Sequence, residues 1–131
     1  MNVRTENDAN EFDSRTRRFE LAEYDHEGRL VDHITAYVTV AWFEGKPRVV
    51  TFSGLKSGST SSGYLTIIGH QTTSLLGAGV SWETIAKSWR GTRFGPSGWV
   101  NGHAVTSLLD AVAQWVDPKW WELEEKESNE N

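Results

Sequence analysis

A glycine- and hydroxyl-rich segment follows the third apolar run of the sequence and has the composition of an anion-binding loop. It reads KSGSTSSG, and its candidate ligand-binding residues are Lys56, Ser57, Gly58, Ser59, Thr60, Ser61 and Ser62. At a helix start, free backbone N–H groups, small residues, hydroxyl donors and one lysine together favour a phosphate or carboxylate. The segment lacks the GxxxxGK[ST] order of a Walker motif. A flexible loop with an ordinary serine cap explains the same composition, so both interpretations stay open.

A second candidate site is the segment RGTRFGPSGW, which joins two predicted helices. Arg90 and Arg93 lie three residues apart, and Pro96 stiffens a segment that three glycines open. Guanidinium groups fork onto phosphate or carboxylate oxygens, and the ring of Phe94 or Trp99 offers a face on which a base stacks. Arginines on loops are often only solvated, and Trp99 also suits a core position. The pairing with the hydroxyl-rich segment favours a binding role for both.

Catalytic and metal-binding chemistry has little support elsewhere in the sequence. The chain has four histidines and no cysteine, which excludes disulfides, thiolate zinc sites and cysteine nucleophiles. The histidines have no HxxxH or HExxH spacing, so no metal site is predicted. His70 has no nucleophile or orienting acid near it in sequence, and the acids around residues 25–32 are explained by a turn. We therefore expect neither an enzyme nor a cofactor.

The elements that must position these segments are strands first and helices second. Between residues 17 and 52 the apolar residues have period two, which predicts antiparallel strands joined by turns at 25–29 and 44–47. After the hydroxyl-rich segment the period becomes 3.6, which predicts a helix with one apolar face: Tyr64, Ile67, Ile68, Gln71, Thr72 and Leu75. Two further helices are expected, on Trp82, Ile85, Ala86 and Trp89, and on Val105, Leu108, Leu109, Val112 and Val116. This order predicts an α+β fold: an antiparallel meander followed by two or three helices packed on one face.

Length and charge limit the organisation and the partners. With 131 residues, the chain fits a flexible arm over 1–16, one domain over 17–121 and an acidic disordered tail over 122–131. The tail has five acids and one lysine, so it carries most of the net charge of -5. Neither end forms a basic stripe, and no apolar run approaches the roughly 20 residues of a membrane span. We expect a cytoplasmic protein that binds no duplex nucleic acid and no membrane. Its seven tryptophans favour a homodimer or higher homo-oligomer.

The order of several short motifs resembles a known family. VTVAWFEGKPRVV, SGLKSGSTSSGYL, GVSWETIAKSW and TRFGPSGW follow one another between about Ile34 and Val116. This order is similar to the C-terminal TSCPD-type domain of adenosylcobalamin-dependent (class II) ribonucleotide reductases. A chain of this length without cysteine has no room for the reductase barrel, so the resemblance implies a detached accessory module. The family's glutamate in "RFEPSG" is Gly95 here, and the loss of that acid is expected to raise the affinity of the loop for anions.

The resemblance and the residues together leave two functions open. A free-standing module of this kind is expected in a phage genome, and its layout is similar to phage proteins that sequester cyclic-nucleotide immune signals, including those that counter Thoeris defence. The first hypothesis is a non-catalytic module that captures a phosphate-bearing nucleotide. The second is an accessory module that docks on a reductase or on a second copy of itself through its Trp-rich helices. A nucleotide-cleaving enzyme is the least supported reading, since no nucleophile or metal set is evident.

Overall fold

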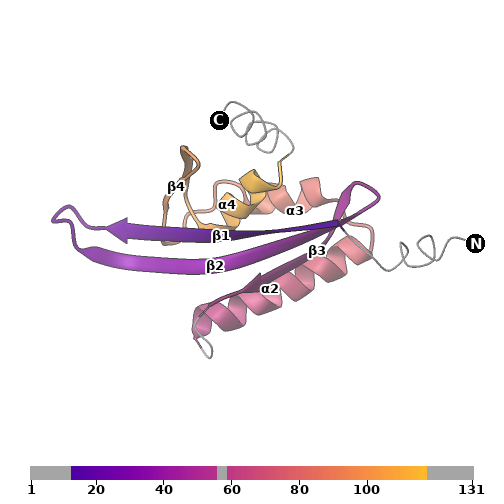
Figure 1. Ribbon diagram of the computed structural model, residues 1–131, viewed down its shortest axis with the longest axis horizontal. Helices are drawn as coiled ribbons and strands as arrows, with labels where there is room; N and C mark the ends of the chain where they lie inside the picture. The colour runs from indigo at the N-terminus through magenta and orange to yellow at the C-terminus, as the bar shows by residue number, and fades with distance from the viewer. Residues whose placement is uncertain (1–12, 56–58, 118–131) are drawn as a thin grey trace, which may run out of the picture. The chain divides into compact units, whose positions relative to one another are not determined.

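The computed structural model describes residues 13–55 and 59–117 and has an α+β fold (Figure 1). Three strands come first, and the α-helices and a short second hairpin follow. The elements are β1 (Asp13–Tyr24), β2 (Leu30–Phe43), β3 (Lys46–Ser53), α2 (Thr60–Gly77), α3 (Trp82–Trp89), β4 (Gly98–Val100), β5 (His103–Val105) and α4 (Leu108–Trp115). The predicted fold class of an antiparallel sheet followed by helices is confirmed.

The first sheet has the order β1-β2-β3, and its turns follow from local sequence. Asp25 accepts backbone hydrogen bonds through its side chain at the β1–β2 turn, where Gly28 has a φ of 82°. The β2–β3 turn has two residues, Glu44 and Gly45, both with positive φ. That is the backbone of a type I′ turn, whose twist matches the flanking strands.

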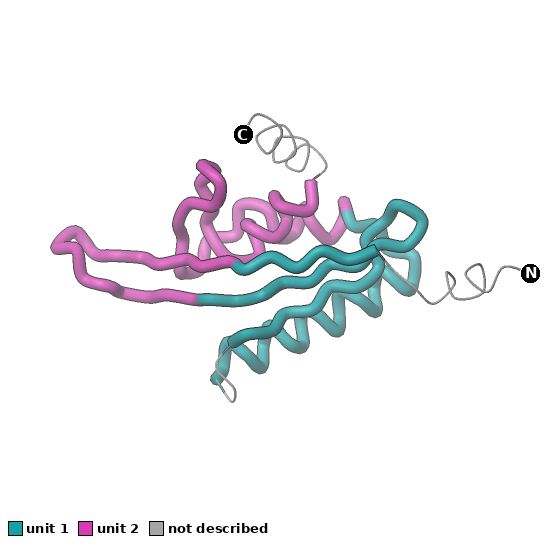
Figure 2. The backbone as a smooth tube through the Cα atoms, viewed as in Figure 1, with its two compact units in different colours: residues 1–18, 35–82 teal, residues 19–34, 83–131 magenta. Residues whose placement is uncertain are grey.

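The chain divides into two compact units, and the division falls within β1 and β2 (Figure 2). Unit 1 comprises residues 1–18 and 35–82, and unit 2 comprises residues 19–34 and 83–131. Residues 13–16, predicted to lie in a flexible arm, form the start of β1. Residues 1–12 and the predicted acidic tail lie outside the described residues, and the single domain over 17–121 stays a prediction.

In unit 1, α2 packs against β3, as Figure 1 shows. The Thr73 hydroxyl donates to the Val50 carbonyl at 3.2 Å and accepts from the Val50 amide at 3.1 Å. A Cβ on Gly69 would lie 3.0 Å from the Val50 carbonyl oxygen, so glycine allows this close approach. Because β3 is the last strand in the sheet order, α2 supplies hydrogen bonds that an edge strand otherwise lacks.

The buried face of α2 differs from the predicted one. Leu65, Gly69, Thr72 and Leu76 are buried, and of the predicted face only Thr72 is among them. Tyr64 is 65% exposed, Ile67 52% and Leu75 45%. The helix carries apolar residues on both sides and has no Asp, Glu, Lys or Arg to mark a solvent side. Hydrophobic periodicity therefore fits two faces, and contact with β3 selects the one holding Gly69.

In unit 2, the core forms around β1, α3 and α4. Phe19 meets Trp115 edge to face with ring centroids 5.6 Å apart. The α3 residues Ile85 and Trp89 are buried, as are nearly all residues of α4. Val105, predicted to begin the last helix, instead lies in β5, which pairs with β4 across a turn at Asn101 and Gly102. The helix starts three residues later, because Ser107 caps it by accepting from the Asp110 amide.

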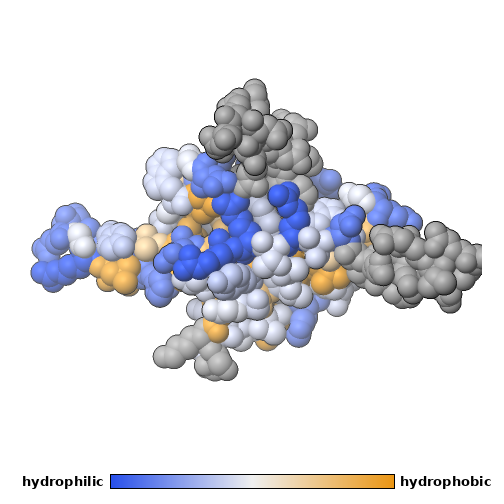
Figure 3. Space-filling model, in the orientation of Figure 1, coloured by the Kyte–Doolittle hydropathy of each residue, from blue (hydrophilic) through white to orange (hydrophobic). Residues whose placement is uncertain are grey.

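The surface of the β1–β2 hairpin end is partly apolar. Tyr24 is 61% exposed, Leu30 57% and Val31 60%, and apolar atoms lie beside the polar turn in Figure 3. Leu30 and Val31 are consecutive residues of β2, so their side chains point to opposite faces, and single exposed apolar residues of this kind are common. Across the described ranges, no helix has the length and apolar character needed to cross a bilayer.

Candidate functional site

The two predicted binding segments lie in different units. Lys56, Ser57 and Gly58 are outside the described residues, and Ser59 to Ser62 belong to unit 1. The Ser59 hydroxyl accepts from the Ser62 amide at 3.0 Å and so caps α2. Thr60, Ser61 and Ser62 lie in the first turn of the helix and not in a loop. The serine cap that the sequence left open is therefore present, and anion binding by this segment stays a prediction.

The two arginines of the second segment have different surroundings. Arg90 lies 3.9 Å from the Asp117 carboxylate, measured from Nη1 to Oδ2, and both side chains are partly exposed. Arg93 lines a pocket that belongs wholly to unit 2. Arg93 is an exposed residue, so its guanidinium pays little desolvation when a ligand binds. The structure thus singles out Arg93 and not Arg90 as the pocket cation.

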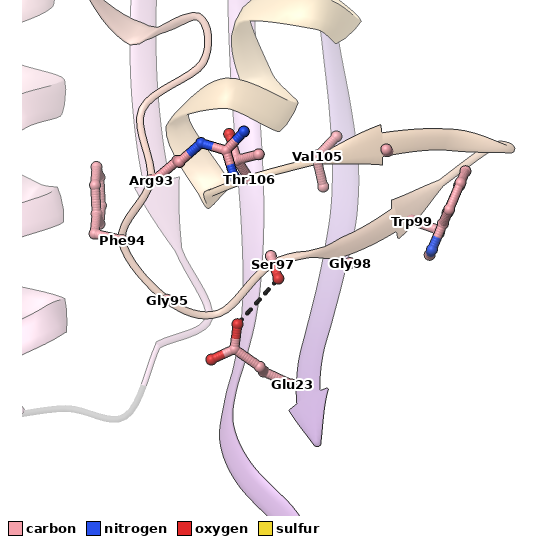
Figure 4. A pocket seen from close by; sticks show the side chains of 10 residues that line it. Glu23, Arg93, Phe94, Gly95, Ser97, Gly98, Trp99, Val105 and Thr106 are labelled. Atoms are coloured by element: carbon pink, nitrogen blue, oxygen red, sulfur yellow. Dashed lines mark hydrogen bonds between the residues drawn. The ribbon is translucent and has the colours of Figure 1, made fainter. Parts of the chain in front are cut away.

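The pocket has a volume of about 470 Å³, within the range of small-molecule sites. Its lining combines the loop that carries Arg93 with the β4–β5 hairpin and one β1 residue: Glu23, Arg93, Phe94, Gly95, Ser97, Gly98, Trp99, Ala104, Val105 and Thr106. Phe94 is 52% exposed and Trp99 73%, so both rings are free to cover a ligand. Figure 4 shows Arg93 pointing toward Thr106, with Phe94 and Trp99 at opposite ends of the lining. Arg93, Phe94 and Trp99, predicted together, therefore share one pocket.

Glu23 is a pocket residue that lies outside both predicted binding segments. Its Oε1 accepts from the Ser97 hydroxyl at 3.0 Å (Figure 4). A Cβ on Gly95 would lie 3.6 Å from Glu23 Oε2 and 3.0 Å from Asp32 Oδ2. Glycine therefore allows the close approach of Asp32, while Glu23 lies at an ordinary contact distance. Two carboxylates thus lie near the loop although the family's glutamate is absent at this position, and the higher affinity for anions expected from that loss stays a prediction.

A buried carboxylate on α4 anchors the start of the pocket loop. Asp110 is 3% exposed. Its Oδ1 accepts from the Gly91 amide at 2.8 Å, and its Oδ2 accepts from the Thr106 amide at 2.9 Å and from Gln114 Nε2 at 3.0 Å. Thr106 also donates its hydroxyl to the Thr92 carbonyl at 2.7 Å. These bonds tie both ends of the 92–106 segment to one helix, and so they position Arg93 and Thr106.

The surroundings of Asp110 lower its pKa. Burial raises the pKa of the carboxyl, but the backbone N–H groups of Gly91 and Thr106 and the side chains of Gln114 and Thr106 favour the ionised form by more. Because the folded pKa lies below the ordinary value, the ionised carboxylate stabilises the fold above about pH 4. This stabilisation is lost as pH falls through the lowered pKa. The spacing Ser107-x-x-Asp110 is the sequence signal that marks the helix start.

The described part of the chain holds no group of three or more metal-ligating side chains. His70 lies on α2 in unit 1, exposed on the helix surface and outside the pocket. The nearest arrangement to a catalytic pair is Ser97 with Glu23. A carboxylate is a weak base toward a serine hydroxyl, and no imidazole lines this pocket.

Comparison with protein families matches residues 11–117 to the TSCPD domain. The match covers most of the chain and includes every described element. The chain therefore belongs to the TSCPD domain family, and the resemblance that its motifs indicated is confirmed. Membership fits a non-catalytic module in general terms. No curated protein and no solved structure matched the chain.

Proposed function

We propose that this TSCPD-domain chain is a non-catalytic binding module that captures a phosphate-bearing nucleotide in the unit 2 pocket. One observation carries the proposal: Arg93, Glu23 and two partly exposed aromatic rings surround a single space of about 470 Å³. A guanidinium suits phosphate oxygens, and an aromatic face suits a base of any kind. A pocket with both features accommodates the two chemical halves of a nucleotide.

Within this proposal, each side chain has a separate task. Arg93 forks onto phosphate oxygens, and Phe94 or Trp99 stacks on the base. The ligand is held and released unaltered, since tight capture needs orientation and charge but no acid–base pair. In its most specific form, the proposal makes the ligand a cyclic-nucleotide immune signal that a phage protein sequesters. That form rests on the similarity in layout alone.

Thermal denaturation with nucleotides tests the proposal. A ligand that binds only the folded state raises the melting temperature, so mono- and cyclic nucleotides are expected to stabilise the protein. Arg93→Ala removes a charge-assisted contact worth roughly 1.5 to 3 kcal/mol, which weakens binding about 10- to 100-fold. Arg90→Ala is the matched control, because Arg90 lies next to Asp117 and not on the pocket lining.

The outcomes separate cleanly. Loss of the ligand-induced shift in Arg93→Ala, with an unchanged circular dichroism spectrum and a normal response in Arg90→Ala, supports the pocket. An equal response in wild type and Arg93→Ala contradicts it. Mass spectrometry of the nucleotide after incubation measures turnover, and a cleaved product would contradict capture without chemistry.

A second candidate function, contact with another protein, is favoured by the exposed side of α2. The described tryptophans of the Trp-rich helices expected to make such a contact, Trp82, Trp89 and Trp115, are each at most 8% exposed. Because these tryptophans are buried, the candidate contact surface is the exposed side of α2. Tyr64, Ile67 and Leu75 are exposed there, on a helix without Asp, Glu, Lys or Arg. Depletion of charge with enrichment of apolar residues is typical of interface cores.

A second copy of this chain is the partner that best fits α2. The chain has a net charge of -5 and repels itself wherever charged faces meet. A charge-free helix face avoids that repulsion and pairs with itself about a two-fold axis. The reductase-docking form of this function rests on the family resemblance, whereas self-association rests on the composition of α2.

A further inference from the structure

We infer that the nucleotide captured in the unit 2 pocket carries guanine, whose Watson–Crick edge is bound by Glu23. This inference rests on the proposed function and names the base. It begins from the one group in the pocket lining that only accepts hydrogen bonds when ionised, the Glu23 carboxylate.

Glu23 is held in place and keeps accepting capacity. The residue is half-buried on β1, and the Ser97 hydroxyl donates to Oε1 at 3.0 Å. Each carboxylate oxygen has two lone-pair sites, so Oε1 has the capacity for a second hydrogen bond and Oε2 has the capacity to accept from a ligand. Figure 4 shows the carboxylate turned toward the loop that carries Ser97 and Arg93. The structure therefore presents an oriented pair of acceptors to a ligand.

Gly95 lies next to this acceptor pair. A Cβ at this position would lie 3.6 Å from Glu23 Oε2 and 3.0 Å from Asp32 Oδ2. A Cβ would be in ordinary contact with Glu23 and slightly too close to Asp32, so glycine leaves room for both carboxylates beside the loop. The negative charge of Asp32 adds to that of Glu23, and together they favour the donor edge of a ligand over an acceptor edge.

Among the four bases, guanine has the edge that fits a carboxylate. Its N1–H and exocyclic N2–H lie side by side and donate in parallel, so they meet the two oxygens as an arginine fork does. Adenine and cytosine pair an exocyclic amine with a ring nitrogen acceptor, whose lone pair faces the second oxygen. Uracil places a single N–H between two carbonyl oxygens, which the carboxylate repels. Recognition on this edge with stacking on an aromatic ring is a common way to bind an unpaired base.

Calorimetric titration of the full chain with GMP, AMP, CMP and UMP tests the inference. GMP is expected to bind about 10- to 100-fold more tightly than the other three, the discrimination typical of one bidentate contact to a base. Glu23→Gln converts the acceptor pair into one acceptor and one donor, which matches adenine. The ratio of GMP to AMP affinity is therefore expected to fall to one or to reverse.

Two further variants keep the readout specific. Glu83→Gln makes the same substitution on an exposed residue of α3 that is absent from the pocket lining, and it is expected to retain the guanine preference. Ser97→Ala removes the hydroxyl that orients Glu23 and is expected to reduce the preference without reversing it. A change in the ratio of affinities is not produced by general loss of folding, which weakens all four ligands equally.

Each outcome decides between the two proposals. Equal affinity of the wild-type protein for GMP and AMP, or an unchanged ratio in Glu23→Gln, overturns the guanine inference. If that binding still depends on Arg93, the proposed nucleotide capture stands. If none of the four monophosphates binds, the guanine inference falls, and nucleotide capture falls as well if cyclic nucleotides do not raise the melting temperature.

Discussion

The buried carboxylate of Asp110 predicts a large loss of stability in Asp110→Asn. Asn has nearly the same shape, but its NH2 group must replace one oxygen of the carboxylate. Placed at Oδ1, it faces the Gly91 amide, which now donates at 2.8 Å; placed at Oδ2, it faces the Thr106 amide and Gln114 Nε2. In either orientation a donor meets a donor within a site only 3% exposed.

The size of the loss in unfolding free energy follows from the amide orientation that loses fewer hydrogen bonds. Turning NH2 toward Gly91 removes one charge-assisted hydrogen bond, worth roughly 1.5 to 3 kcal/mol, and weakens the others by removing the charge. We therefore expect Asp110→Asn to lower the free energy of unfolding by about 2 to 4 kcal/mol at pH 7. Glu83→Gln is the control, because Glu83 is an exposed residue in the first turn of α3, where loss of its charge costs at most about 1 kcal/mol.

Urea unfolding at several pH values measures both the magnitude and its cause. Because the pKa of Asp110 is lowered in the folded state, its contribution is complete above about pH 4 and declines as pH falls further. The difference between wild type and Asp110→Asn is therefore expected to shrink toward acid pH. A difference below about 0.5 kcal/mol at pH 7, or one that stays constant down to pH 2, would refute the role assigned to this carboxylate.

Two further predictions concern α2. Thr73→Val leaves the buried Val50 amide and carbonyl without their helix partner, so the free energy of unfolding in urea titrations should fall by about 1 to 3 kcal/mol. The control Thr66→Val loses an exposed hydrogen bond within the helix and should change that free energy by under about 0.5 kcal/mol. Ile67→Lys places a charge on the exposed apolar side of α2 and should convert a wild-type dimer to a monomer in sedimentation velocity, while Thr66→Lys should not. A specific dimer is expected to have a dissociation constant below about 100 µM. A wild-type protein that stays monomeric at about 100 µM would therefore contradict self-association through α2.

The first sheet was predictable because its strands have one buried face. Phe19, Leu21, Ala36, Val38 and Val40 alternate with more exposed neighbours, and all five are buried. The α2 face was not predictable, since Leu65 and Leu76 on one side are matched by Ile67 and Leu75 on the other. Only the close approach of Gly69 to β3, a tertiary contact, distinguishes the two sides.

The β4–β5 hairpin has a local sequence signal, although the sequence was interpreted as helical from Val105 onward. Asn101 and Gly102 both have positive φ and join β4 to β5, and Asn-Gly is the strongest short-range indication of such a turn. Treating Val105 as the first residue of the last helix hid this turn.

The candidate site was predictable where its residues are close in sequence. Arg93, Phe94 and Trp99 lie on one loop and its adjoining strand, and they share the pocket. Glu23 comes from β1, 74 positions before its partner Ser97, so no local pattern places it there. Asp110 had a partial signal in its spacing from Ser107, but its bonds to Gly91 and Thr106 depend on the fold.

The charges around the pocket limit which nucleotides suit it. The lining holds one guanidinium, Arg93, and one carboxylate, Glu23, while Asp32 adds a second carboxylate beside Gly95. The first phosphate of a ligand is attracted by Arg93, but each further phosphate meets the same single cation and both carboxylates. At about 8 Å and an effective dielectric constant of 20, each such repulsion costs about 2 kcal/mol. If the proposed nucleotide capture is right, nucleoside monophosphates and cyclic nucleotides, with fewer charges than triphosphates, should bind more tightly than triphosphates, and raising the salt concentration should reduce that difference in affinity.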